Sequence, residues 1–123
     1  MMSLQEEKND SDLYFLEYKP GSIKLNIGQY NQTVLISSQK AIEYDGQISA
    51  LEDICESHIH LILKDDPEVV LIGTGQKQEL PVIDIVAQLA KVGKSVDFMA
   101  SDKACKTYNL LVNEGRNVSC III

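Results

Sequence analysis

The sequence predicts a mixed α/β fold, a single layered domain with an amino-terminal antiparallel hairpin and a carboxyl-terminal parallel β-α-β-α-β unit. The first observation is the run Val69–Gly73, whose four consecutive branched apolar residues are typical of a strand buried on both faces. The second is that helical and extended apolar segments alternate from this run to the end of the sequence. Short connections between such elements favour parallel strands joined by right-handed crossovers.

Composition and charge exclude several classes of function. The chain has 123 residues, is 45% hydrophobic and carries a net charge of −7 at pH 7. That charge disfavours nucleic acids and anionic membranes, because both attract basic surfaces. Residues 1–12 are polar and show no targeting pattern, and no apolar run is long enough to cross a bilayer. We therefore expect a polar tail at residues 1–12, a domain at residues 13–123, a cytoplasmic location and no membrane insertion.

The amino-terminal half is predicted to be extended. Residues 13–18 favour a strand and are followed by a turn signal at residues 19–22. Residues 23–27 alternate between apolar and polar, and residues 30–37 form a second extended run, so these two segments are expected to pair as an antiparallel hairpin. Residues 41–45 are predicted to form a third short strand, closed by a turn at Asp45-Gly46.

A helix is predicted over residues 50–63. Ser49 and Glu52 have the spacing of a capping box, and apolar residues follow at helical intervals. Pro67 disfavours helix in the residue before it, so the helix is expected to end ahead of the central strand.

The carboxyl-terminal half continues with two further helices and two further strands. Pro81 suits the first turn of a helix that is expected to reach Val92, with an apolar face formed by Ile83, Val86, Ala87, Leu89 and Ala90. Glycines are predicted to end both helices, and Gly93 is expected to adopt the left-handed conformation. The remaining expectations are a strand at 95–99, a helix at 103–114 capped by Ser101 or Asp102, a strand at 117–123, and terminating glycines Gly93 and Gly115.

Two segments together resemble a known family. IGTG at residues 72–75 and MASDKACKTYNLLVNEGRNV at residues 99–118 are similar to the pattern of the Mth938-like family, also called DUF498. That family includes a mitochondrial assembly factor of respiratory complex I and the adipogenesis-associated Mth938 domain protein. Here Ser101 replaces the usual threonine and keeps its hydroxyl, whereas Lys106 replaces a common arginine and loses a planar fork. The resemblance implies a small Mth938-like α/β domain that acts through protein partners, and it implies no reaction.

The Gly73–Gly75 turn is the first candidate site. Free N–H groups between a strand and a helix can bind phosphate, but the sequence has neither G-x-G-x-x-G nor G-K-[ST] here. A tight exit turn from a buried strand is therefore favoured over a nucleotide site. A weaker functional alternative remains, a pocket for a small anion or a peptide at the carboxyl ends of the parallel strands.

The cysteines and histidines offer no specific chemistry. Cys105 lies near a predicted helix start beside two lysines, which can lower a thiol pKa, but no base is adjacent and a packing role is favoured. Cys55 and Cys120 occupy apolar runs and are predicted to be core residues. His58 and His60 lack further ligands nearby, so the sequence predicts no metal, no cofactor and no defined catalytic residue.

Two hypotheses about function remain open. The first is a binding or assembly module that contacts another protein. The second is an enzyme acting on a small anionic substrate, with Cys105 or Tyr108 in an undefined role. Tyr108 and Asn109 either tie their helix to neighbouring backbone or line the pocket. The candidate cleft comprises Gly73, Thr74, Gly75, Met99, Ser101, Tyr108, Asn109 and Arg116.

Overall fold

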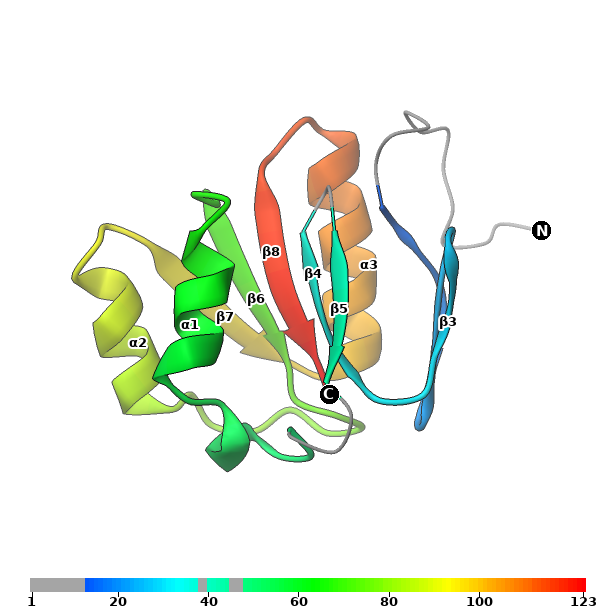
Figure 1. Cartoon of the computed structure of the whole chain (residues 1–123), viewed down its shortest axis with the longest axis horizontal. Helices are drawn as coiled ribbons and strands as arrows, with labels where there is room; N and C mark the ends of the chain where they lie inside the picture. Colours follow the sequence, from blue (N-terminus) through cyan, green and yellow to red (C-terminus); the bar gives the residue numbers. More distant parts are fainter. Residues whose placement is uncertain (1–12, 38–39, 45–47) are drawn as a thin grey trace.

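The computed structural model describes residues 13–37, 40–44 and 48–123, which form two sheets (Figure 1). The first is antiparallel, in the order β1-β2-β3, and comprises β1 (Phe15–Lys19), β2 (Ser22–Leu25) and β3 (Gly28–Tyr30). The second is mixed, in the order β5-β4-β8-β6-β7, and comprises β4 (Thr33–Ser37), β5 (Ala41–Tyr44), β6 (Val69–Gly73), β7 (Ser95–Met99) and β8 (Val118–Ile122). The predicted tail at residues 1–12 and the predicted turn at Asp45-Gly46 lie outside the described residues.

The parallel unit predicted from the sequence is confirmed. β6 pairs in parallel with both β7 and β8, so the three predicted strands lie in one sheet. Val70, Leu71 and Ile72 are completely buried, as expected for the central strand of a covered sheet. β4 completes the mixed character of the sheet because it is antiparallel to β8 and to β5.

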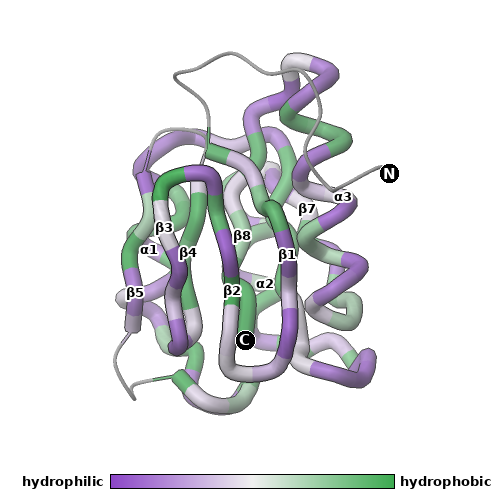
Figure 2. Tube along the Cα trace, turned by 90° about the vertical axis from the view of Figure 1, so that its right-hand side faces the viewer, coloured by the Kyte–Doolittle hydropathy of each residue, from purple (hydrophilic) through white to green (hydrophobic). Residues whose placement is uncertain are grey.

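Each face of the five-stranded sheet has its own cover. The helices α1 (Glu56–Leu63) and α2 (Ile83–Ala90) pack on one face, where Val70 and Ile72 belong to their core cluster. The helix α3 (Ser101–Asn113) and the three-stranded sheet pack on the other, where Leu71 belongs to a second cluster (Figure 1). Figure 2 shows β1, β2 and β3 side by side as a layer of their own. Alternate residues of β6 thus hold two separate cores together.

The predicted strand at residues 30–37 is wrong in one respect, because it is two strands in different sheets. β3 pairs with β2, as the predicted hairpin requires, but β4 pairs with β5 and β8. Asn31 and Gln32 between them are exposed, whereas Thr33–Ser37 is buried throughout. The polar pair lets the chain leave the first sheet, and the apolar run after it has to enter the covered one.

The predicted helix at 50–63 is also interrupted. A short 3-10 turn, η1 (Leu51–Asp53), comes first, and Ile54 and Cys55 are extended before α1 begins at Glu56. Asp53, rather than the predicted Glu52, accepts hydrogen bonds from the N–H groups of Ser49 at 3.0 Å and Ala50 at 3.2 Å. These hydrogen bonds cap the start of η1, and the extended backbone of Ile54 and Cys55 separates it from α1.

The other helix boundaries shift by about two residues. α2 begins at Ile83, so Pro81 precedes the helix and does not lie in its first turn. α3 begins at Ser101, two residues before the predicted start. The predicted terminating glycines are confirmed, since Gly93 and Gly115 have φ angles of +77° and +83°.

Candidate functional site

The Gly73–Gly75 turn lies where it was predicted, after β6 at the carboxyl edge of the parallel strands. The N–H of Thr74 donates to the Met99 carbonyl at 2.8 Å, and the N–H of Gly75 donates to Ser101 Oγ at 2.8 Å. In return, the N–H of Ser101 donates to the Gly75 carbonyl at 2.7 Å. The structure therefore brings these predicted residues together, but it uses the N–H groups of Thr74 and Gly75 to hold the turn against the start of α3.

Ser101 has a different role from the predicted helix cap. Its side chain makes no capping hydrogen bond to α3, and the residue is completely buried. Ser101 Oγ instead accepts from Gly75 and donates to the carbonyl of Ile123 at 2.8 Å. One hydroxyl thus joins the ends of β6 and β8 to the first turn of α3, and we call this set of contacts the β6–α3 junction.

The two glycines of the turn are needed for different reasons. Gly75 has a φ of +98°, a conformation that side chains resist. Gly73 is instead required by close approach, because a Cβ there would lie 2.7 Å from Ser101 Oγ. Thr74, only 6% exposed, donates through Oγ1 to the Lys77 carbonyl at 2.5 Å. The turn is a bonded part of the protein interior.

Tyr108 and Asn109 lie farther along α3, under β1. Asn109 Oδ1 accepts from the N–H of Phe15 at 2.8 Å, and Asn109 Nδ2 donates to the Phe15 carbonyl at 2.8 Å. The rings of Tyr108 and Phe15 meet edge to face at 5.2 Å between centroids. Both α3 residues are buried. Of the two alternatives, the structure supports the one in which they tie the helix to neighbouring backbone.

Arg116 lies at the opposite end of the sheet. Its Nε donates to Glu68 Oε1 at 2.6 Å, and Glu68 immediately precedes β6. From its first to its last residue β6 extends about 13 Å, and this length separates the ion pair from Gly73. Arg116 therefore cannot add charge to the turn, contrary to its place in the predicted cleft.

Two of the three cysteines are buried, and the third is exposed, contrary to its predicted core position. Cys105 and Cys120 are completely buried, and burial raises the pKa of both thiols well above the usual range. This agrees with the packing role favoured for Cys105. Cys55 is exposed, so its predicted core position is wrong. It precedes α1 with Sγ 3.1 Å from Ser57 Oγ, and this contact lowers the pKa of the thiol.

His58 has a local structural role. Its Nδ1 accepts from the N–H of Cys55 at 3.0 Å, and its ring meets Tyr44 edge to face at 4.9 Å. Burial lowers the pKa of His58. Within residues 13–37, 40–44 and 48–123, no group of three histidine, cysteine, aspartate or glutamate side chains is placed to hold a metal ion.

An exposed apolar surface on and before α2 was missed by the sequence reasoning. Ile83 and Val86 were assigned to the buried side of their helix, but they are 80% and 39% exposed. The buried residues of α2 are Ile85 and Leu89. Leu80 in the preceding loop is 87% exposed. We call Leu80, Ile83 and Val86 the α2 apolar face. In the sequence it is visible as a second series of apolar residues beside the buried pair Ile85 and Leu89.

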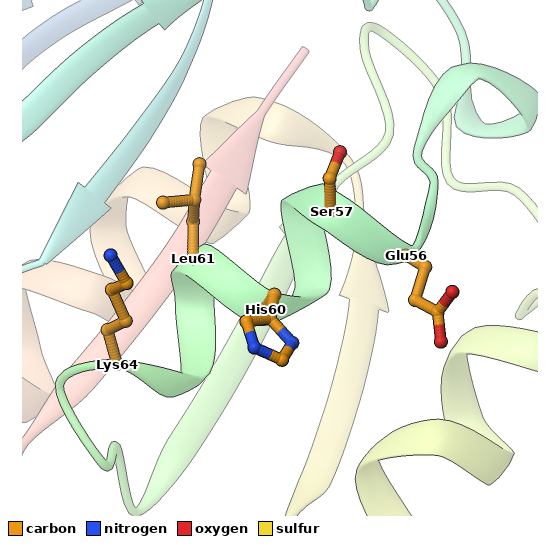
Figure 3. A pocket seen from close by; sticks show the side chains of 5 residues that line it. All are labelled: Glu56, Ser57, His60, Leu61 and Lys64. Carbon is orange, nitrogen blue, oxygen red and sulfur yellow. The ribbon is translucent and has the colours of Figure 1, made fainter.

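A surface hollow of about 620 Å³ runs along α1 (Figure 3). Its described lining comes from one exposed side of that helix: Glu56, Ser57, His60, Leu61 and Lys64. The lining mixes both charges, and Figure 3 shows the side chains spread along the helix without converging on a point. This arrangement lacks the gathered polar groups of a reaction site.

Comparison with known proteins places the chain in a family. Residues 15–123 match the family described as "Protein of unknown function (DUF498/DUF598)". The chain belongs to that family. A "13 kDa major membrane protein" from Francisella tularensis is 58% identical over 123 residues, which is all of both chains. The bovine NADH dehydrogenase (ubiquinone) 1 alpha subcomplex assembly factor 3 is 23% identical, over 99% of this chain and 66% of its own length.

Solved structures show the same fold. A crystal structure from Bordetella parapertussis has a TM-score of 0.83 at 25% identity and covers 94% of this chain and 98% of its own. A solution structure from Bordetella pertussis, described as a Mth938-like domain, has a TM-score of 0.76 at 22% identity and covers 99% and 92%. The Mth938-like fold expected from the resemblance is thereby confirmed. Among the described residues, no helix has the length and apolar character needed to cross a membrane.

Proposed function

We propose that this chain is a non-enzymatic protein-binding module that acts in the assembly or regulation of a partner protein. The α2 apolar face is the observation that carries this proposal. Leu80 and Ile83 are each at least 80% exposed. Only a contact from outside the described residues would remove their apolar surface from water. The similarity to an assembly factor supports the same conclusion.

Burial of this face would contribute to the binding of a partner protein. Burying one leucine or isoleucine side chain fully contributes roughly 1.5–3 kcal/mol. A few such residues, clustered and desolvated together, supply most of the affinity in typical interfaces. The α2 apolar face offers two of them, Leu80 in the loop before α2 and Ile83 at the start of a helix that Ile85 and Leu89 fix to the sheet.

The alternative, an enzyme for a small anionic substrate at the Gly73–Gly75 turn, has weaker support. Cys105 and Tyr108, the residues assigned to it, are completely buried. The N–H groups of Thr74 and Gly75, which would receive the anion, are already bonded. We therefore prefer the binding module.

We also propose the cytoplasm as the working location. The cysteines at positions 55, 105 and 120 are all free, which suits a reducing compartment. The competing location is a membrane surface, suggested by the name of the Francisella relative. The net charge of −7 disfavours contact with anionic lipids.

The test compares the chain with a double variant, Leu80→Lys with Ile83→Lys, in cells of its own organism. A matched control is Ile27→Lys, because Ile27 is 58% exposed but lies between β2 and β3. We expect the native chain and the control to migrate in an assembly well above 13.7 kDa on native gels, and the double variant to migrate alone.

Two outcomes would contradict the proposal. One is an unchanged assembly for the double variant, which would mean that the α2 apolar face binds nothing. The other is loss of the double variant from the membrane fraction without any protein assembly in the native sample. That result would assign the face to lipid.

A further inference from the structure

We propose that the outer edge of β7 accepts an extended segment of the partner protein as an added strand, with residues that alternate between apolar and cationic. This inference rests on the proposed function, since it names the partner's chemistry and the place where it binds. Three features carry it: an open strand edge, exposed apolar residues on the helix that packs on that strand, and a carboxylate on the strand that makes no ion pair with any described residue.

The open edge is a consequence of sheet order. β7 is the last strand in the order β5-β4-β8-β6-β7, and within the described part of the chain it pairs with β6 alone. All five of its residues are in register with β6, so the strand is regular along its length. Its outward N–H and C=O groups form a template on which another strand can pair.

One flank of α2, the helix that packs on β7, is apolar. Ile85 and Leu89 point to the sheet, and Val86 lies about 100° further round the helix than Ile85. Ile83 and Ala90 continue in the same direction, and both are exposed. The opposite flank is polar: Asp84, Gln88 and Lys91.

The helix α2 packs on this edge strand. Ile85 and Leu89 share a core cluster with Phe98 and Val96 of β7, and Figure 1 shows α2 on the far side of α1 from β8. The exposed apolar residues Ile83 and Val86 thus belong to the helix nearest the open edge, beyond which an added strand would lie at about 4.8 Å.

The two faces of β7 require different side chains from the added strand. Val96 and Phe98 belong to the core under α2, so its residues on that face have to be apolar. Asp97 pairs in register with Leu71 and is exposed on the other face. Asp97 makes no ion pair with any described residue. A lysine or arginine opposite it supplies the missing charge.

Charge also decides between occupants. In the symmetric antiparallel pairing of two copies, the central Asp97 residues face each other, and like charges directly opposite are destabilising. The chain's own residues 1–12 contain four acidic residues and one lysine, so they fit no better. The overall charge of −7 attracts a cationic partner instead.

The first experiment uses the purified full chain and a capped seven-residue probe peptide of alternating valine and lysine. Backbone amide NMR is followed during titration, with an alternating valine–glutamate peptide as the matched control. We expect the valine–lysine peptide to shift the amides of Ser95–Met99 and to slow their hydrogen exchange. No change at these amides, or an equal response to both peptides, would overturn the inference.

The second experiment exchanges the charge. Asp97→Lys should lower the affinity for the valine–lysine peptide by about fivefold, because the cross-strand charge pair changes from attraction to repulsion. The affinity for the valine–glutamate peptide should rise, because its pair changes from repulsion to attraction. Glu114→Lys, at an exposed position after α3, should alter neither affinity. A binding affinity that is the same for Asp97→Lys and the native chain would contradict the proposed pairing.

Native gels separate failure of this inference from failure of the proposed function. If the double variant Leu80→Lys with Ile83→Lys disrupts the cellular assembly but Asp97→Lys leaves it intact, the module binds a partner without adding a strand. If neither variant changes the assembly, the proposed function itself is wrong.

Discussion

Gly73 lies so close to α3 that a side chain at this position has no room. Gly73→Ala places a Cβ 2.7 Å from Ser101 Oγ and 3.0 Å from the Ser101 Cα, so backbone has to move. We expect a loss of about 1–3 kcal/mol in the free energy of unfolding, as for other overpacked cores. Chemical denaturation measures it. Gly28→Ala is the control, because nothing lies within 4 Å of a Cβ there; equal costs for both variants would refute the close approach.

His58 should make stability depend on pH. Burial lowers its pKa, so the folded chain binds this proton less readily than the unfolded chain. The stabilising contribution is complete above the unfolded pKa of about 6.5 and is lost as the pH falls below it. We expect the denaturation midpoint to drop on acidification from pH 7.5 to 5.5, and to drop less in His58→Asn.

The control for this pH dependence is the other histidine. His60 is exposed on α1, so His60→Asn should keep the native pH dependence. If both variants behave like the native chain, the burial of His58 has no energetic consequence.

At the scale of elements, Asn109 attaches the three-stranded sheet to α3. Asn109→Ala leaves the buried N–H and C=O groups of Phe15 without their side-chain partner. An unsatisfied buried group costs about 1–3 kcal/mol, so for two groups we expect a loss of roughly 2–6 kcal/mol and faster amide exchange in β1. Asn113→Ala, exposed on the same helix, should cost far less.

We expect the β6–α3 junction not to bind small anions. The weaker alternative drawn from the sequence, a pocket for a small anion at this turn, requires phosphate or acetate to shift the amides of Gly73–Gly75 and Ser101. Because the N–H groups of Thr74, Gly75 and Ser101 are bonded within the protein, we expect no shift during titration followed by NMR. Saturable shifts at these amides would restore the predicted pocket and the enzyme hypothesis with it.

Local pattern explains which elements were predictable. The carboxyl-terminal half was predicted well because each element carries its own periodicity and its own glycine stop, as at Gly93 and Gly115. The division between β3 and β4 was not, because strand propensity continues past Asn31 and Gln32 and only the sheet pairings reveal the switch. Propensity describes a segment, whereas sheet membership depends on distant partners.

The candidate site was less predictable for a related reason. The residues at the ends of β6 and β7 were grouped correctly, since parallel strands bring their carboxyl ends together. Whether their N–H groups are free depends on Ser101 Oγ, whose orientation no sequence pattern records. Similarly, α2 has two apolar series, and only its docking on β7 decides that Ile85 is buried and Ile83 exposed.

At the scale of the whole molecule, one flank has an open strand edge and exposed apolar residues that neither core buries. Both faces of β6 are covered, and β5 and β7 form the two edges of its sheet. β7 is the strand on which α2 packs through Ile85 and Leu89, and α2 and the loop before it carry the α2 apolar face. We therefore propose that this flank binds the partner and that the rest of the fold supports it.

Site-specific photo-crosslinking in native cells tests this claim most directly. A photoreactive residue is placed at Leu80 or Ile83 and, as controls, at Ile27 or Leu110, which are 58% and 59% exposed elsewhere on the surface. The account predicts one discrete protein adduct from positions 80 and 83 and none from 27 and 110. Adducts of equal yield from all four positions, or lipid adducts alone from positions 80 and 83, would contradict it.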